Sequence, residues 1–111
     1  MVVARADTAA RLEQELRRGI VVLAVLSQLK RAEYGYSLRQ ALAQRGMAIE
    51  EGTLYPLLRR LEEQGLLASE WRIEDGPPRR YYALSADGRA LLKALTATWH
   101  ELVDTTNRLL E

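Results

Sequence analysis

The chain contains no cysteine, and this absence excludes disulfide bonds and metal sites built on thiolates. It also favours a reducing compartment, so we expect a cytoplasmic protein. Phenylalanine is absent as well. The interior of this 111-residue chain must therefore be built from leucine, valine and isoleucine, together with two tryptophans and five tyrosines.

Signals for membranes, catalysis and metals are also missing. The longest apolar run covers residues 20–26, far fewer than the roughly 20 residues that a membrane-spanning helix needs. No secretory signal, nucleophile–base pattern or glycine-rich phosphate loop is recognisable. The single histidine, His100, has no second histidine, cysteine or carboxylate cluster beside it. We therefore expect no membrane contact, no enzymatic activity, no cofactor and no bound metal.

The net charge is only +1, unlike the strongly basic balance of many DNA-binding domains. Residues 28–49 contain four cations and one acid, whereas residues 50–84 contain five arginines and seven acids. A DNA-binding surface must therefore come from a few arginines that the fold positions. The near-neutral charge also keeps open an alternative function, a module that binds only other proteins.

A helix is predicted over about residues 9–30, after a loose segment at residues 1–8. Residues 20–26 are apolar on all sides, so we expect this helix to form the centre of the core. A turn at residues 33–37, with Gly35 at the bend, precedes a second helix that runs through Gln44.

A third helix follows. Together, the second and third helices have the spacing of a helix-turn-helix. We expect Thr53 to cap it, Pro56 to lie in its first turn and Gly65 to end it. Arg59 and Glu63 point away from its apolar face, so Arg59 is placed to read a DNA major groove. The alternative is a surface ion pair between these two residues. The apolar face is made of Leu54, Leu57, Leu58 and Leu61.

After the third helix the apolar period changes from 3.6 to 2, which predicts strands at residues 67–73 and 79–84. Residues 74–78, Glu-Asp-Gly-Pro-Pro, form the turn between them. Tyr82 and Leu84 are expected to face inward. A hairpin directly after a helix-turn-helix is a wing, and Arg79 and Arg80 lie just past its tip. They either reach DNA phosphates or the minor groove, or stay solvated.

Ser85 is expected to cap a last helix of about 25 residues, or about 38 Å. Its apolar positions step by three and four residues, which is a heptad seam suited to packing against another helix. A projecting apolar helix needs a partner, and a second copy of the chain is the simplest one. The predicted dimer seam contains Leu92, Leu95, Trp99, Leu102, Thr106 and Leu109.

Three stretches resemble the PadR family of bacterial transcriptional regulators, in its compact subgroup with one C-terminal helix. They are Tyr34-Gly-Tyr36, then Gly-Thr-Leu-Tyr-Pro-Leu-Leu-Arg-Arg-Leu-Glu-Glu-Gln-Gly-Leu at residues 52–66, and Gly-Pro-Pro-Arg-Arg-Tyr-Tyr-Ala-Leu-Ser at residues 76–85. The resemblance covers the chain from about Leu16 onward. Glu50 and Glu51 depart from the family pattern, in which a small polar cap often precedes the glycine.

Patterns and resemblance together predict a mainly helical α+β fold. A winged helix-turn-helix with a two-stranded β-wing occupies residues 9–84, and a dimerisation helix occupies residues 85–111. The resemblance implies a sequence-specific, homodimeric repressor bound to a palindromic promoter site in double-stranded DNA. The residues implied to lie near DNA are Tyr36, Gly52, Thr53, Tyr55, Arg59, Arg79 and Arg80. For Tyr36 and Tyr55, packing within the domain is the alternative.

Trp99 is the one large aromatic residue of the dimer seam. A two-fold axis near it brings two indole rings together, and two flat rings can hold a planar aromatic effector that releases the repressor. Multidrug-responsive members of the family have a tryptophan in the corresponding part of the last helix, so the resemblance implies the same role. The alternative is that Trp99 only fills the dimer interface.

Overall fold

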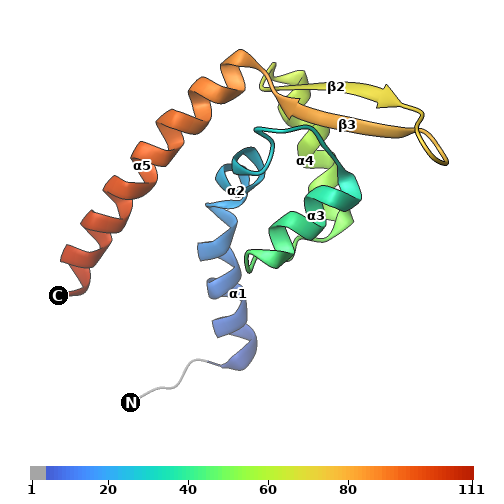
Figure 1. Ribbon diagram of the computed structural model, residues 1–111. Coiled ribbons are helices and arrows are strands. Elements are labelled where there is room, and N and C mark those ends of the chain that lie inside the picture. Colours follow the sequence, from blue (N-terminus) through green and yellow to red (C-terminus); the bar gives the residue numbers. More distant parts are fainter. Residues whose placement is uncertain (1–4) are drawn as a thin grey trace.

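The computed structural model describes residues 5–111, which fold into a winged helix-turn-helix with a long C-terminal helix (Figure 1). The helices are α1 (Ala6–Arg18), α2 (Val21–Ser27), α3 (Gly35–Gln44), α4 (Glu51–Glu63) and α5 (Ala86–Leu110). The strands are β1 (Glu33–Tyr34), β2 (Leu67–Arg72) and β3 (Arg79–Leu84). The expected loose segment falls partly on residues 1–4, which lie outside the described residues, while residues 6–8 belong to α1, so that expectation is wrong there.

The predicted wing is confirmed, and a third strand extends it. The antiparallel sheet has the order β1-β3-β2, in which Leu67 pairs with Leu84 and Trp71 with Arg80. The predicted turn at residues 33–37 was wrong in part, because Glu33 and Tyr34 form β1 and the helix begins directly at Gly35. A strand of two residues is too short to show an alternating pattern.

The single helix predicted over residues 9–30 was also wrong. The helix is interrupted at Gly19, and Ile20 adopts a non-helical backbone (φ −104°, ψ 2°) before α2 begins. Glycine is a poor helix former, and the amide of Ile20 donates to the carbonyl of Arg17 at 3.1 Å in a tight turn. The expectation of a central core helix holds only for α2, where Val25 and Leu26 are fully buried, because α1 contains no buried residue.

The predicted leucine face of α4 is confirmed. Its four leucines are at most 7% exposed, and burying a side chain of this size contributes about 1.5–3 kcal/mol. They pack with buried residues of α2, α3, the sheet and the start of α5 into one core, which leaves the opposite face of α4 in solvent. The core is largely leucine, as the absence of phenylalanine predicts. It includes Leu26, Leu29, Leu38, Leu42, Leu54, Leu57, Leu58, Leu61, Leu67, Leu84 and Leu92.

The start of α4 differs from the prediction. Glu50 is the cap residue and Glu51 the first helical residue, so the amide of Thr53 lies inside the helix and donates to the Glu50 carbonyl at 3.0 Å. The earlier start is stabilised by the acidic Glu51, whose carboxylate favours the positive end of a helix and also binds Arg39 at 3.0 Å.

The earlier start moves Pro56 from the first turn into the second. Its missing N–H leaves the carbonyl of Gly52, four residues earlier, without a helical hydrogen bond. The predicted end at Gly65 is confirmed, because Gly65 has φ +79° and the amide of Leu66 donates back to the Leu61 carbonyl at 2.9 Å.

The last helix begins as predicted, since Ser85 Oγ accepts a hydrogen bond from the amide of Gly88 at 3.0 Å. Its first turns are fixed in the core: Leu92 is buried, and Gly88 lies so close to the Leu66 carbonyl that a side chain there would clash. Farther along, Leu102 and Leu109 are 55% and 77% exposed.

Both α1 and α5 extend away from the wing, and the described chain measures 58 × 30 × 24 Å (Figure 1). On α1, Leu12 and Leu16 are 57% and 80% exposed, so each of these helices carries apolar side chains into solvent. None of the helices in residues 5–111 has the length and hydrophobicity required to cross a membrane.

Candidate nucleic-acid interface

A groove of about 550 Å³ lies where the start of α3, the flank of α4 and the wing meet. We call it the wing groove. It brings together five of the seven residues predicted to lie near DNA, from three separate elements. Its lining consists of Tyr34, Gly35, Tyr36, Tyr55, Leu58, Arg59, Trp71, Arg79, Arg80 and Tyr82.

The other two predicted residues, Gly52 and Thr53, lie outside the wing groove but on the same helix. Both are exposed in the first turn of α4. Thr53 borders a second cavity of about 570 Å³, between α1 and the connection that leads into α4. Nothing lies within 4 Å of the position that a Cβ on Gly52 would occupy, so the backbone there is open to approach.

Arg59 is an uncompensated cation at this surface. Its side chain is exposed and forms no salt bridge with any residue between 5 and 111. The surface pair with Glu63, the alternative to a DNA contact, is therefore not formed. Because the leucine face of α4 is buried, the guanidinium of Arg59 is left with solvent or a bound anion as its partner.

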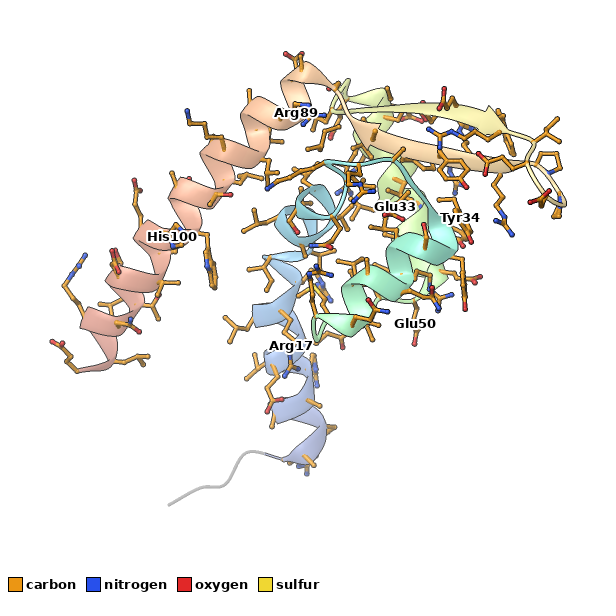
Figure 2. The ribbon with its side chains drawn as sticks, viewed as in Figure 1. Arg17, Glu33, Tyr34, Glu50, Arg89 and His100 are labelled. Carbon is orange, nitrogen blue, oxygen red and sulfur yellow. The ribbon has the colours of Figure 1, made fainter. Side chains whose placement is uncertain are left out.

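Arg79 is held in place by an aromatic ring and not by an acid. Its guanidinium carbon lies 4.5 Å from the ring centroid of Tyr34, and that ring meets Tyr81 edge-on at 5.3 Å. Figure 2 shows Tyr34 where β1 meets the start of α3, below the wing. A stacked guanidinium keeps its N–H groups free at the edge, where a phosphate oxygen can accept from them.

On the same hairpin, Arg72 is compensated. It pairs with Glu70 at 2.7 Å and stacks over Tyr81 at 4.2 Å. The hydrogen bond to the Glu70 carboxylate raises the pKa of the Arg72 guanidinium, so this group stays charged. It adds no free positive charge to the wing groove, because its partner neutralises it.

Arg80 is compensated as well, and by a different element. Its Nη2 donates to Glu62 Oε1 of α4 at 2.9 Å, and its Nε donates to Ser69 Oγ of β2 at 3.0 Å. Sequence reasoning did not find this pairing, since Glu62 and Arg80 are 18 residues apart. It also missed Trp71, which is 64% exposed on the wing; the hairpin register, in which Trp71 faces Arg80, is the signal that points to it.

The two predicted tyrosines differ in their surroundings. Tyr55 is half-buried and lies over Gly35, where an added Cβ would be 2.7 Å from the tyrosine hydroxyl. Tyr36 is 54% exposed, and its hydroxyl accepts a hydrogen bond from Gln40 at 2.9 Å. Tyr55 therefore packs against the start of α3 and also lines the wing groove. Packing within the domain and a position near the candidate DNA surface are thus compatible for this residue.

The residues of the predicted dimer seam divide into two groups. Leu92 and Leu95 pack against the core of their own chain. Trp99, Leu102, Thr106 and Leu109 lie beyond the core and are exposed, with Trp99 at 39%. His100 is exposed on the same helix (Figure 2), and residues 5–111 contain no group of three or more acidic, histidine or cysteine side chains placed to bind a metal.

Comparisons with known proteins agree with this architecture. Residues 22–94 match the family described as "Transcriptional regulator PadR-like family". The chain is 44% identical over 80 residues to the transcriptional regulator Rv3488 of Mycobacterium tuberculosis, which covers 71% of this chain and 75% of that protein.

Solved structures are similar over almost the whole chain. A PadR family transcriptional regulator from Eggerthella lenta has a TM-score of 0.89 and 50% identity, over 95% of this chain and 94% of that one. A PadR-like transcriptional regulator from Bacillus cereus has a TM-score of 0.78 and 28% identity, over 87% of this chain and 97% of that one.

The contact between Gly35 and Tyr55 predicts a coupled effect on stability. Gly35→Ala should displace the Tyr55 ring and destabilise the domain by about 1–2 kcal/mol. In a Tyr55→Ala background the same change should be neutral or stabilising, because alanine favours a helix over glycine by about 0.5–1 kcal/mol. Urea unfolding of the four proteins measures the difference, and equal effects of Gly35→Ala in both backgrounds would contradict the predicted contact.

Proposed function

Because this chain belongs to the PadR-like family of transcriptional regulators, we propose that it is a homodimeric repressor that binds a palindromic promoter site. The observation that carries the DNA-binding part is the wing groove. Two exposed arginines that pair with no acid in residues 5–111, Arg59 of α4 and Arg79 of the wing, border the same groove. A nucleic-acid backbone is the partner that cations of a recognition helix and of a wing would contact together.

In the proposed complex, the exposed face of α4 enters the major groove. Gly52 and Thr53 lie at its N-terminal end, which is the end that a recognition helix offers to base edges. The absence of a side chain at Gly52 lets the helix backbone approach the DNA. Arg59 then reads a base, and Tyr36 and Tyr55 contribute hydroxyl groups near the sugar-phosphate backbone.

The wing supplies the second contact with DNA. Arg79, oriented by the Tyr34 ring, donates to a phosphate from the wing side of the wing groove. The DNA-binding unit then spans residues 9–84. Residues 85–111 form the dimerisation helix, whose first turns attach it to that unit.

We propose that a second copy of the chain covers the exposed apolar side chains of α5 and α1. A folded chain that leaves leucines and a tryptophan in solvent on two projecting helices lowers its free energy by burying them. The seam from Leu95 to Leu109 supplies most of the contact, and Leu12 and Leu16 of α1 add to it. An isologous pair of this kind gives the two-fold symmetry that a palindromic site requires.

The DNA contacts predict two different mutant phenotypes. Arg59→Ala should weaken binding to the operator by about 1–3 kcal/mol while affecting other sequences less. Arg79→Ala should weaken binding to every sequence and flatten the salt dependence of the affinity by about one unit. Fluorescence anisotropy at several salt concentrations, with an operator selected from genomic fragments and a mixed-sequence duplex, measures both.

Arg108→Ala is the matched control, because it removes one arginine near the far end of α5. Unchanged DNA affinity of an Arg59→Ala, Arg79→Ala double variant would contradict the proposed DNA interface. An absence of salt-dependent DNA binding in the wild type would instead favour the protein-interaction module that the near-neutral charge left open.

The proposed dimer predicts that Leu102→Asp abolishes association. The side chain is 55% exposed in the single chain, so the fold should tolerate the change, whereas an unpaired carboxylate in an apolar interface is costly. Sedimentation velocity should show monomers. His100→Asp adds the same charge about 200° around the helix and should leave the dimer intact. A wild-type chain that remains monomeric at micromolar concentration would refute this part of the proposal.

The proposed effector site predicts where a planar aromatic dye binds. Two Trp99 rings near the two-fold axis would sandwich the dye, so Trp99 fluorescence should be quenched in a Trp71→Phe background. The chain contains only these two tryptophans, so the reciprocal Trp99→Phe variant should lose both quenching and affinity. Equal dye affinity of the Trp99→Phe variant would show that the site lies elsewhere.

A further inference from the structure

We propose that Arg80 is a positioning residue that ties the wing to α4 through Glu62, and that it does not contact phosphate. The inference rests on the proposed function, because it concerns how the two proposed DNA-binding elements are held relative to each other. It replaces the sequence-based expectation that Arg80, like Arg79, binds DNA. We call the three side chains of Glu62, Ser69 and Arg80 the wing brace.

Each member of the wing brace contacts the other two, and each comes from a different element. Arg80 of β3 donates to Glu62 of α4 at 2.9 Å and to Ser69 of β2 at 3.0 Å. The hydroxyl of Ser69 donates to the second carboxylate oxygen of Glu62. Both oxygens of Glu62 are therefore engaged, as are two of the three guanidinium nitrogens of Arg80.

The surroundings of Arg80 favour a structural contact over a phosphate ligand. The side chains of Arg80 and Glu62 are only 38% and 27% exposed, so solvent screens their attraction less than that of a fully exposed pair. The guanidinium also lies 5.6 Å from the Tyr82 ring centroid and 5.9 Å from that of Trp71. A phosphate would have to displace Glu62 to reach it, whereas Arg59 and Arg79 pair with no acid in the part of the chain that the structure describes.

The wing needs such a contact on its α4 side, because the core anchors only its inner end and β1 pairs with β3 only as far as Tyr81. Leu67 and Leu84 pair at the inner end of the hairpin and are buried, whereas Trp71 and Arg79 near the tip are exposed. The wing brace lies between these two ends. A hairpin held only at its base would have to be ordered when DNA binds, and that ordering lowers affinity.

The two roles of Arg80 predict opposite effects for Glu62→Gln. If Arg80 were a phosphate ligand, removing the Glu62 charge would free it and strengthen DNA binding. If it braces the wing, Glu62→Gln should weaken DNA binding about three- to tenfold, although the protein becomes more positive. Arg80→Gln should weaken binding similarly and leave the salt slope unchanged, whereas loss of a phosphate contact lowers that slope by about one unit.

Glu70→Gln is the matched control for charge. It also removes one negative charge, and it breaks the exposed pair with Arg72. Within residues 5–111, no ion pair or side-chain hydrogen bond joins Glu70 to α4. It should bind a mixed-sequence duplex at least as tightly as the wild type. The charge-swapped variant Glu62→Arg, Arg80→Glu should recover most of the affinity that either single change loses.

A readout without DNA keeps this inference separate from the proposed function. In a Trp99→Phe background, Trp71 is the only tryptophan and lies beside Arg80. Glu62→Gln and Arg80→Gln should both lower its fluorescence anisotropy as the wing loosens, and Glu70→Gln should not. If the wild type fails to bind DNA, the proposed function fails while this measurement still tests the wing brace.

The proposal is supported only if both measurements agree for the Glu62 and Arg80 variants. It is overturned if Glu62→Gln binds DNA as tightly as the wild type or more tightly. It is also overturned if Trp71 anisotropy is the same in wild type, Glu62→Gln and Arg80→Gln, since the wing would then be held without this ion pair.

Discussion

Burial of the leucine face of α4 is the contact on which the rest of the structure depends. Leu54, Leu58 and Leu61 are at most 2% exposed, and they are packed against α2, α3 and the base of the sheet. A helix rotates as one body, so fixing this face also fixes the direction of Arg59 and Thr53 on the other side. The same hydrophobic contact that stabilises the domain therefore orients its proposed DNA-reading face.

Ion pairs then determine which charges remain available at that face. Arg39 binds Glu51 at the start of α4, Arg80 binds Glu62 near its end, and Arg72 binds Glu70 within the wing. These pairs neutralise three arginines locally, whereas Arg59 and Arg79 have no acidic partner within residues 5–111. A net charge of +1 is therefore compatible with a local positive surface, because what matters at the wing groove is which arginines lack an acidic partner, not the charge of the whole chain.

The parts of the fold that sequence reasoning predicted are those with a repeating pattern. The face of α4, the boundaries of β3 and the Ser85 cap follow from apolar spacing and a local hydrogen bond. The errors arise where an element is very short or depends on a distant residue. The strand β1 has two residues, and the start of α4 is stabilised by Arg39, which lies 12 residues before its partner Glu51. In the candidate site, the gathering of tyrosines and arginines was predictable, but the partner of Arg80 was not, since it depends on how the wing folds back onto α4.

The attachment of α5 decides how an event at the proposed dimer seam would reach the DNA-binding unit. Leu92 and Gly88 fix the first turns of the helix to the core, and Trp99 lies seven residues beyond Leu92, about 10 Å along a continuous helix. A helix of this length is stiff and its first turns are fixed to the core, so a ligand that separates two Trp99 rings would tilt each α5 together with its winged unit. That tilt would change the separation of the two α4 helices, which must match about 34 Å, one turn of DNA. Regulation in the proposed dimer therefore needs no rearrangement within the winged unit, only a change in the angle between the two α5 helices.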